Sequence, residues 1–327
     1  MAQIAKVVKL WEHAHRRPVE SLSVAGETGE VLLCDRRDSV VLLGPEGKVI
    51  HDEPMPLAPV DGEVASDGQS VFILSFEGFL SRMRPDGGMD WEKWVDRDGA
   101  TIAVRAKGQS AVVASHKGRF FVISSSGERL REVHTPEPVA HAVYASRAGT
   151  LFLASSMGWI GIYDKQANPT GEFHINHPIM DLKVCESGKK IFLPAGEDGF
   201  NVINSSSEEM TTINPGFYVA KLGINRNGDL IAAVCPKGNL ALLNLSGDVL
   251  WSEKTKDSWA LCGMTGDGTR FVAVNNKGLA VCYGVMGMTE RKAPPPPEPA
   301  PRKAPAQKER APERQEPGKS DLDYLEL

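Results

Sequence analysis

Short hydrophobic runs rich in Val, Ile, Leu and Phe alternate with polar, Gly-containing turns through most of the chain. Runs of this kind are typical of β-strands, and Gly between them marks turns that need a positive φ angle. Towards the end of the patterned region, three successive strands are predicted at 259–264, 270–274 and 279–283. Turns are predicted between them at 266–268 and 276–278. The pattern therefore indicates an all-β protein built from short strands.

The strand pattern repeats every 40 residues without an inserted or deleted residue. Its seven units begin at Trp11, His51, Trp91, Arg131, Gly171, Thr211 and Trp251. Gly recurs at fixed places in these units, for example at Gly78, Gly118, Gly158, Gly238 and Gly278. Four strands in a unit of this length are typical of a propeller blade. The sequence therefore predicts a seven-bladed β-propeller of four-stranded repeats.

The two ends of the patterned region differ in a way that predicts how the ring closes. In the earlier units the outermost strand of a blade runs across the unit boundary, as at 48–53 and 248–253. The segment 7–12, before the first unit, has the same character, whereas the segment 288–292 is polar. We therefore expect the N-terminal segment to supply the outermost strand of the seventh blade. Such closure removes a free sheet edge that would otherwise invite aggregation.

One unit boundary resembles a known kind of repeat. The stretch Leu245-Ser246-Gly247-Asp248-Val249-Leu250-Trp251 is similar to the Gly-x-x-x-Trp end of a PQQ-like repeat, and residues 87–91 form a looser copy. The chain thus resembles the PQQ-like and WD-repeat-like seven-bladed propellers, although the Trp-Asp dipeptide of WD repeats is absent from every unit. The resemblance implies the fold and no particular activity, because propellers serve as enzymes, receptors and scaffolds.

Composition agrees with a globular domain, at 41% hydrophobic and 24% charged residues with a net charge of −5. There is no basic excess to suggest a nucleic-acid partner, and no apolar run approaches the ~20 residues that span a membrane. The N-terminal residues do not resemble a signal peptide. The five cysteines are scattered and lack a Cys-x-x-Cys motif, which favours reduced, buried thiols. We therefore expect a monomeric, cytoplasmic protein without membrane insertion.

The composition changes sharply after the last unit. Residues 293–319 hold nine prolines among charged and small residues, which predicts a disordered linker after a propeller at 1–292. The final segment, 320–327, contains large apolar residues again beside three acids. We interpret it as a docking peptide for another protein, the alternative being an idle terminus. Its predicted anchors are Leu322, Tyr324, Leu325 and Leu327.

Within a blade, the strands are lettered A to D from the channel outwards. The D-to-A connections and the B-to-C turns of a propeller emerge on one face, so we expect four arginines of the first blade to meet there. They are Arg16, Arg17, Arg36 and Arg37. Such a cluster suits a carboxylate-rich or phosphorylated ligand. The alternative is a solvated loop with local ion pairs, because Asp35 and Asp38 flank the second pair of arginines.

Large apolar and imidazole side chains are predicted on the same face. Phe76, Trp94 and Phe217 are candidates for a protein-binding surface on a rigid scaffold. His134 and His174 hold equal places in adjacent blades, which is a necessary condition for a shared metal ion. Without close ligand spacing, polar loops are the preferred interpretation, and we predict no bound metal.

Alternate residues of the innermost strands should point into the central channel. Those with titratable side chains are Asp61, Glu63, His141, Asp181, Lys183 and Lys221. Carboxylates and a histidine around one axis could perform acid–base chemistry or hold Ca²⁺, as in lactonase-like propellers. The mixed signs suit mutual salt bridges equally well.

We therefore expect a non-catalytic adaptor or scaffold without a cofactor, which binds other proteins through the loop face and the C-terminal peptide and binds no nucleic acid. One alternative is a hydrolase or isomerase that works in the channel. Its catalytic candidates are Asp61, Glu63, His141 and Asp181. The other alternative is a sensor of a small ligand.

Overall fold

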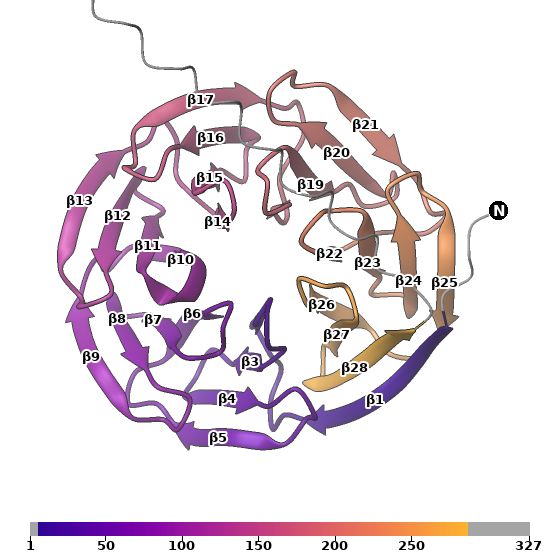
Figure 1. The fold of residues 1–327 in the computed structure, drawn as a ribbon, viewed down its shortest axis with the longest axis horizontal. Coiled ribbons are helices and arrows are strands. Elements are labelled where there is room, and N and C mark those ends of the chain that lie inside the picture. The colour runs from indigo at the N-terminus through magenta and orange to yellow at the C-terminus, as the bar shows by residue number, and fades with distance from the viewer. Residues whose placement is uncertain (1–5, 287–327) are drawn as a thin grey trace, which may run out of the picture. The chain divides into compact units, whose positions relative to one another are not determined.

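The computed structural model describes residues 6–286, which form seven four-stranded antiparallel sheets arranged as the blades of a ring (Figure 1). The predicted seven-bladed all-β propeller is confirmed. Blade 1 contains β2 (Ser21–Val24), β3 (Val31–Cys34), β4 (Ser39–Leu43) and β5 (Val49–Pro54). Blade 2 contains β6 (Pro59–Val64), β7 (Val71–Ser75), β8 (Phe79–Met83) and β9 (Met89–Trp94). Blade 3 contains β10 (Gly99–Val104), β11 (Ser110–Ser115), β12 (Arg119–Ser124) and β13 (Arg129–His134), with a 3-10 turn at Ala106–Gly108.

The remaining blades follow the same plan. Blade 4 contains β14 (His141–Ala145), β15 (Thr150–Ala154), β16 (Trp159–Tyr163) and β17 (Pro169–His174). Blade 5 contains β18 (Lys183–Val184), β19 (Lys190–Pro194), β20 (Phe200–Asn204) and β21 (Met210–Ile213). Blade 6 contains β22 (Lys221–Ile224), β23 (Leu230–Val234), β24 (Asn239–Asn244) and β25 (Val249–Lys254). Blade 7 contains β26 (Trp259–Met264), β27 (Arg270–Asn275), β28 (Leu279–Met286) and β1 (Lys6–Ala14).

The core of the molecule lies between the blades. Second strands such as β7 and β23 are buried along their whole length, because each blade is covered on both faces by its neighbours. Side chains that alternate along one strand therefore enter two different hydrophobic clusters. On β27, Phe271 packs between blades 6 and 7, whereas Val272 packs between blades 7 and 1. All five cysteines are buried in these layers as free thiols.

The N-terminal strand closes the ring, as the sequence predicts. The order of strands in blade 7 is β1-β28-β27-β26, so the outermost strand comes from the opposite end of the described chain. β1 pairs antiparallel with β28 from Lys6 opposite Met286 to Ala14 opposite Leu279. β28 continues three residues beyond the end at 283 expected from the repeat, because β1 offers it partners there.

The glycine that recurs near the end of most units has a steric cause in two turns that the structure describes. Gly47 has a φ angle of +77°, and a Cβ atom added to it would lie 2.6 Å from Cγ of Trp11. Gly127 has a φ angle of +83°, and its added Cβ would lie 2.9 Å from Cδ2 of Trp91. These turns thus need glycine both for the backbone conformation and for the close approach of the preceding blade.

Blade 5 departs from the repeat at its innermost strand. β18 has two residues, whereas the first strands of the other blades have at least four. Pro194 occupies the place on β19 that Ala154 occupies on β15, and proline has no N–H to donate to a neighbouring strand. Asp181, expected within this first strand, therefore precedes it. Among residues 6–286, no helix is long and apolar enough to cross a membrane.

Candidate functional site

The D-to-A connections and the B-to-C turns meet on one face of the ring, which we call the loop face. The amide of His15, after β1, donates to the carbonyl oxygen of Gly278, between β27 and β28, at 2.9 Å. The amide of Val95, after β9, likewise donates to the carbonyl oxygen of Gly78, between β7 and β8, at 2.8 Å. Residues of these two kinds of segment are therefore neighbours, as the arginine prediction requires.

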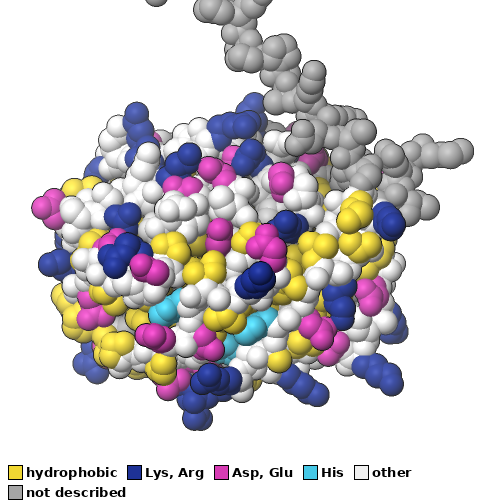
Figure 2. Space-filling view, turned by 60° about the horizontal axis from the view of Figure 1, so that its bottom comes forward, with side chains coloured by type: hydrophobic (Ala, Val, Ile, Leu, Met, Phe, Trp, Pro, Cys, Tyr) yellow, Lys and Arg dark blue, Asp and Glu magenta, His cyan; other side chains and the backbone are white. Residues whose placement is uncertain are grey.

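The predicted arginines lie together on the loop face of blade 1, but most have acidic partners. Arg17 Nη1 lies 2.5 Å from Asp38 Oδ1 and 3.3 Å from Asp35 Oδ2. Arg16 lies 3.6 Å from a carboxylate oxygen of Asp52, and Arg36 lies 3.4 Å from one of Glu20. Arg37 is exposed and has no ion pair within the described residues. Figure 2 shows acidic and basic side chains interspersed over one side of the molecule. The corner is thus a network of ion pairs, with Arg37 still available to a ligand.

Asp35 anchors this network and is 2% exposed. Its Oδ1 accepts hydrogen bonds from the amides of Arg37, Asp38 and Ser39 at 2.8, 3.0 and 3.0 Å. Burial alone would raise the pKa of Asp35, but these amides and the Arg17 guanidinium lower it below its usual value. Arg17 therefore has a structural role, because it neutralises a buried carboxylate.

Large apolar side chains are exposed on the loop face. Phe76 is 73% exposed and Trp94 is 56% exposed, both in blade 2, and Met157 of blade 4 is 78% exposed. Phe217 differs from them, because it is partly buried and packs against the hydrophobic cluster between blades 5 and 6. Phe76 and Trp94 are thus exposed on the loop face, whereas Phe217 contributes mainly to the core.

The loop-face histidines have separate partners. His174 Nε2 lies 3.0 Å from Glu137 Oε1, and His177 Nε2 lies 3.0 Å from the side-chain nitrogen of Asn201. Within residues 6–286, no group of three or more His, Cys, Asp or Glu side chains could hold a metal ion. His134 and His174 therefore do not form part of such a group.

The channel contains two separate polar clusters. In the first, Asp61 bridges three neighbouring innermost strands, because it accepts hydrogen bonds from Ser21 Oγ at 2.7 Å and Thr101 Oγ1 at 2.9 Å. Glu63 accepts one from the amide of Val104 at 2.9 Å. Burial, opposed by this amide and assisted by the charge of Asp61, raises the pKa of Glu63 to about 8.

The second cluster is formed by blades 4 to 6. Asp181 lies 3.6 Å from Nζ of Lys183 and 3.8 Å from Nζ of Lys221. Burial alone would raise the pKa of Asp181, but the two ammonium groups lower it. His141 Nε2 lies 3.3 Å from the carbonyl oxygen of Ile179, and burial lowers the pKa of His141. The four predicted catalytic candidates are therefore divided, with Asp61 and Glu63 in one cluster and His141 and Asp181 in the other.

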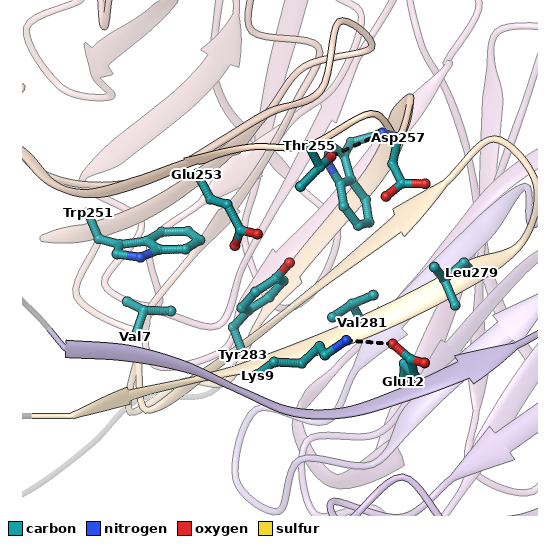
Figure 3. Close-up of a pocket in the computed structure, with 11 residues that line it drawn as sticks. Val7, Lys9, Glu12, Trp251, Glu253, Thr255, Asp257, Leu279, Val281 and Tyr283 are labelled. Atoms are coloured by element: carbon teal, nitrogen blue, oxygen red, sulfur yellow. Dashed lines mark hydrogen bonds and ion pairs between the residues drawn. The ribbon is translucent and has the colours of Figure 1, made fainter.

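Two pockets were not predicted from the sequence. One, of about 590 Å³, lies in blade 5 beside the irregular β18 and is lined by His177, Met180, Pro194, Asn201 and Met210 among others. The other, of about 320 Å³, lies between blades 6 and 7 (Figure 3). Pro194 within a predicted strand was a signal for the first. For the second pocket, the signal was that the sequence predicts no C-to-D turn after the strand at 279–283.

No family model matches the chain, and the search of curated proteins finds no match to it. The predicted linker at 293–319 and the predicted docking peptide at 320–327 lie outside the described residues. The anchors Leu322, Tyr324, Leu325 and Leu327 therefore remain predictions.

Proposed function

We propose that this propeller is an adaptor that binds other proteins through its loop face. The observation that carries the proposal is the exposure of Phe76, Trp94 and Met157 on the loop face, in turns or at the end of a strand of the blades. Large apolar side chains in such places are typical anchors of a protein interface. In the channel, by contrast, Asp181 is paired with Lys183 and Lys221, and the carboxylate of Asp61 accepts hydrogen bonds from neighbouring blades, which favours binding over catalysis.

Charge around these anchors would set which partner binds. Arg16, Arg36 and Arg37 are exposed at the arginine corner and favour an acidic partner. The C-terminal peptide at 320–327 would add a second docking element in the cytoplasm. We also propose that the protein is related to the PQQ-like or WD-repeat propellers.

The test compares the proteins that the full chain retains with those retained by two double variants. Phe76→Ser with Trp94→Ser changes the loop face, and Met89→Ser with Leu130→Ser changes exposed apolar residues of the outer strands. We expect at least one protein to be lost with the first variant and retained by the second. If the two variants retain the same proteins as the unchanged chain, the loop face is not the binding surface.

A second candidate function is acid–base catalysis in the channel, as in a lactonase-like hydrolase or an isomerase. The observation in its favour is Glu63, whose pKa of about 8 lets it exchange a proton near neutral pH. The test is hydrolysis of a set of lactones with and without Ca²⁺. Activity that disappears in Glu63→Gln and Asp61→Asn would favour the enzyme, and its absence in the unchanged protein would favour the adaptor.

A third candidate is a sensor of a small ligand, which the blade 5 pocket favours. Its volume of about 590 Å³ lies within the range of ligand sites. Asn201, only 4% exposed, donates to His177 and accepts a hydrogen bond from Thr212 Oγ1 at 2.8 Å. A compound that raises the melting temperature of the protein, but not of Asn201→Ala, would support this function.

A further inference from the structure

The ring closure makes one interface between blades different from the others. In four units, the first residue contacts the C-to-D turn of the next blade; these residues are Trp11, His51, Trp91 and Arg131. Nε1 of Trp11, in blade 7, donates to the carbonyl oxygen of Pro45, in the turn of blade 1, at 3.0 Å. Nε1 of Trp91, in blade 2, donates to the carbonyl oxygen of Ser125, in the turn of blade 3, at 2.9 Å. Two tryptophans at this place thus bind a main-chain carbonyl group.

Trp251 is the matching residue between blades 6 and 7, and it has no such turn to face. The third and fourth strands of blade 7 come from opposite ends of the described chain, so no turn joins them. Val285, which holds the place of Pro45 in the repeat, is paired with Val7 in the sheet. Among the residues that the structure describes, none accepts a hydrogen bond from Nε1 of Trp251.

The pocket of about 320 Å³ opens at this place, between β25 on one side and β1 and β28 on the other (Figure 3). Tyr283 lies on its floor and is 5% exposed, with its hydroxyl group directed into the pocket. The Tyr283 ring is stacked on Phe271 at 4.9 Å and tilted against Trp251 at 5.6 Å between ring centroids. No described residue forms a hydrogen bond with the hydroxyl group. The pocket therefore has aromatic walls and two polar groups without partners in the described part of the chain.

The charged residues of the pocket are mostly acidic. Glu12, Glu253 and Asp257 line it together with one basic residue, Lys9, whose Nζ is 2.7 Å from Glu12. Glu253 is exposed and has no ion pair within the described residues. Burial and these three carboxylates raise the pKa of Tyr283, so its hydroxyl group stays protonated at neutral pH. The pocket thus offers uncompensated negative charge beside aromatic rings.

We infer that this pocket binds an extended segment of a partner protein that carries an arginine. A main-chain carbonyl of the segment accepts a hydrogen bond from Trp251, as turn carbonyls do at the equivalent interfaces. The arginine guanidinium pairs with Glu253 and lies against Tyr283, because a planar cation combines carboxylate pairing with stacking on aromatic rings. This site lies between blades 6 and 7 and reaches the loop face at Thr255 and Asp257, but it contains none of the residues of the proposed adaptor surface, which lie in other blades.

The test follows the indole N–H resonance of Trp251 in the isotope-labelled full chain, identified by its loss in Trp251→Phe. The probe is acetyl-Ala-Ala-Arg-Ala-Ala-amide. The matched control peptide carries citrulline, which has nearly the shape of arginine without its charge. We expect the arginine peptide to shift the resonance until it saturates, and the citrulline peptide to bind about tenfold more weakly. The absence of a saturable shift with the arginine peptide, or equal binding of both peptides, would overturn the inference.

Two variants test the residues themselves. Glu253→Gln should weaken the arginine peptide about tenfold, whereas Glu53→Gln, at the matching place on β5, should leave its binding unchanged. Equal effects of the two variants would contradict the assignment. A resonance that moves with neither peptide but moves when residues 293–327 are deleted would mean that another segment of this chain fills the pocket, and would overturn the partner assignment. The Phe76→Ser, Trp94→Ser double variant, which changes blade 2, should have no effect here, and this separates the inference from the adaptor proposal.

Discussion

Two carboxylates on β6 show how much the surroundings of a single residue matter. Asp61 accepts hydrogen bonds from Ser21, Thr101 and the amide of Ile102, which link three blades. Glu63, two residues further along, accepts one hydrogen bond, from the amide of Val104. Burial then dominates, so the pKa of Glu63 rises to about 8. Residues that look equivalent in the sequence thus differ in the hydrogen bonds that hold their carboxyl groups.

This difference predicts a pH dependence of stability. The pKa of Glu63 is higher in the folded protein than its ordinary value of 4.5, so between about pH 5 and pH 8 the folded state binds more protons than the unfolded state. The free energy of unfolding should therefore fall as pH rises through this window. Because Glu63→Gln removes the titration, the stability of the variant relative to the unchanged protein should rise by roughly 1–3 kcal/mol from pH 5 to pH 8.

Urea denaturation of both proteins across this range measures the effect. Glu53→Gln, an exposed carboxylate on β5, serves as the control and should show no such trend. A stability difference for Glu63→Gln that is constant with pH would contradict the raised pKa.

The turn glycines allow a second test at this scale. Gly47 and Gly216 both have positive φ angles, of +77° and +84°, but an added Cβ would meet Trp11 only at Gly47. At Gly216 it would meet nothing within 4 Å. Gly216→Ala should therefore cost about 1 kcal/mol of backbone strain, and Gly47→Ala about 2–4 kcal/mol, because it adds a steric clash. Chemical denaturation measures both, and equal losses would show that the contact with Trp11 is unimportant.

At the scale of the elements, β1 has a role that no other strand has. It completes blade 7 by pairing with β28 and so joins the two ends of the ring. Its side chains also contribute to the clusters on either side, Val7 between blades 6 and 7 and Trp11 between blades 7 and 1. Loss of this strand would expose the edge of β28 and leave both interfaces incomplete.

Deleting residues 1–12 should therefore lower the melting temperature by about 10 °C or more, since each kcal/mol lost corresponds to roughly 2–4 °C in a domain of this size. The matched control deletes residues 293–327, which lie outside the described residues. We expect that deletion to change the melting temperature by at most about 2 °C. Similar melting temperatures for the two truncated proteins would contradict closure by β1.

At the scale of the whole molecule, the channel and the loop face differ in how their charges are satisfied. In the channel, Asp61, Asp181 and their partners connect neighbouring blades. On the loop face, the ion pairs of Arg16 and Arg36 are exposed, and Arg37 has none within the described residues. Exposed pairs contribute little to stability, so these arginines can exchange their partners for those of a ligand.

Binding of an acidic partner should consequently depend on salt. A labelled peptide of eight glutamates should bind the full chain more weakly as ionic strength rises, because a Debye length of about 8 Å at physiological salt screens exposed charges. Changing Arg16, Arg36 and Arg37 to Ser should weaken binding at low salt by roughly tenfold. Arg17 is left unchanged, because its removal would leave the buried Asp35 without its guanidinium partner.

Fluorescence anisotropy at several salt concentrations provides the measurement. The control variant loses the same number of positive charges, by changes to Ser in the C-to-D turns on the opposite side of the blades. The changed residues are Lys48, Arg84 and Lys165. Salt-independent binding, or equal weakening by both triple variants, would exclude the arginine corner as the site.

The sequence by itself determined the repeat, the strands and the closure of the ring. These follow from local chemistry: hydrophobic alternation places a strand, glycine permits a turn such as that at Gly47, and the surplus strand at 7–12 needs a partner. The tertiary structure decided which side chains are free to act. Arg17 and Phe217 fit a binding surface by type, yet one neutralises Asp35 and the other packs against the core. The open pocket at Trp251 also arises because blade 7 has no C-to-D turn to contact this tryptophan. The repeat predicts where Trp251 lies, but only the tertiary structure shows whether the next blade supplies its partner.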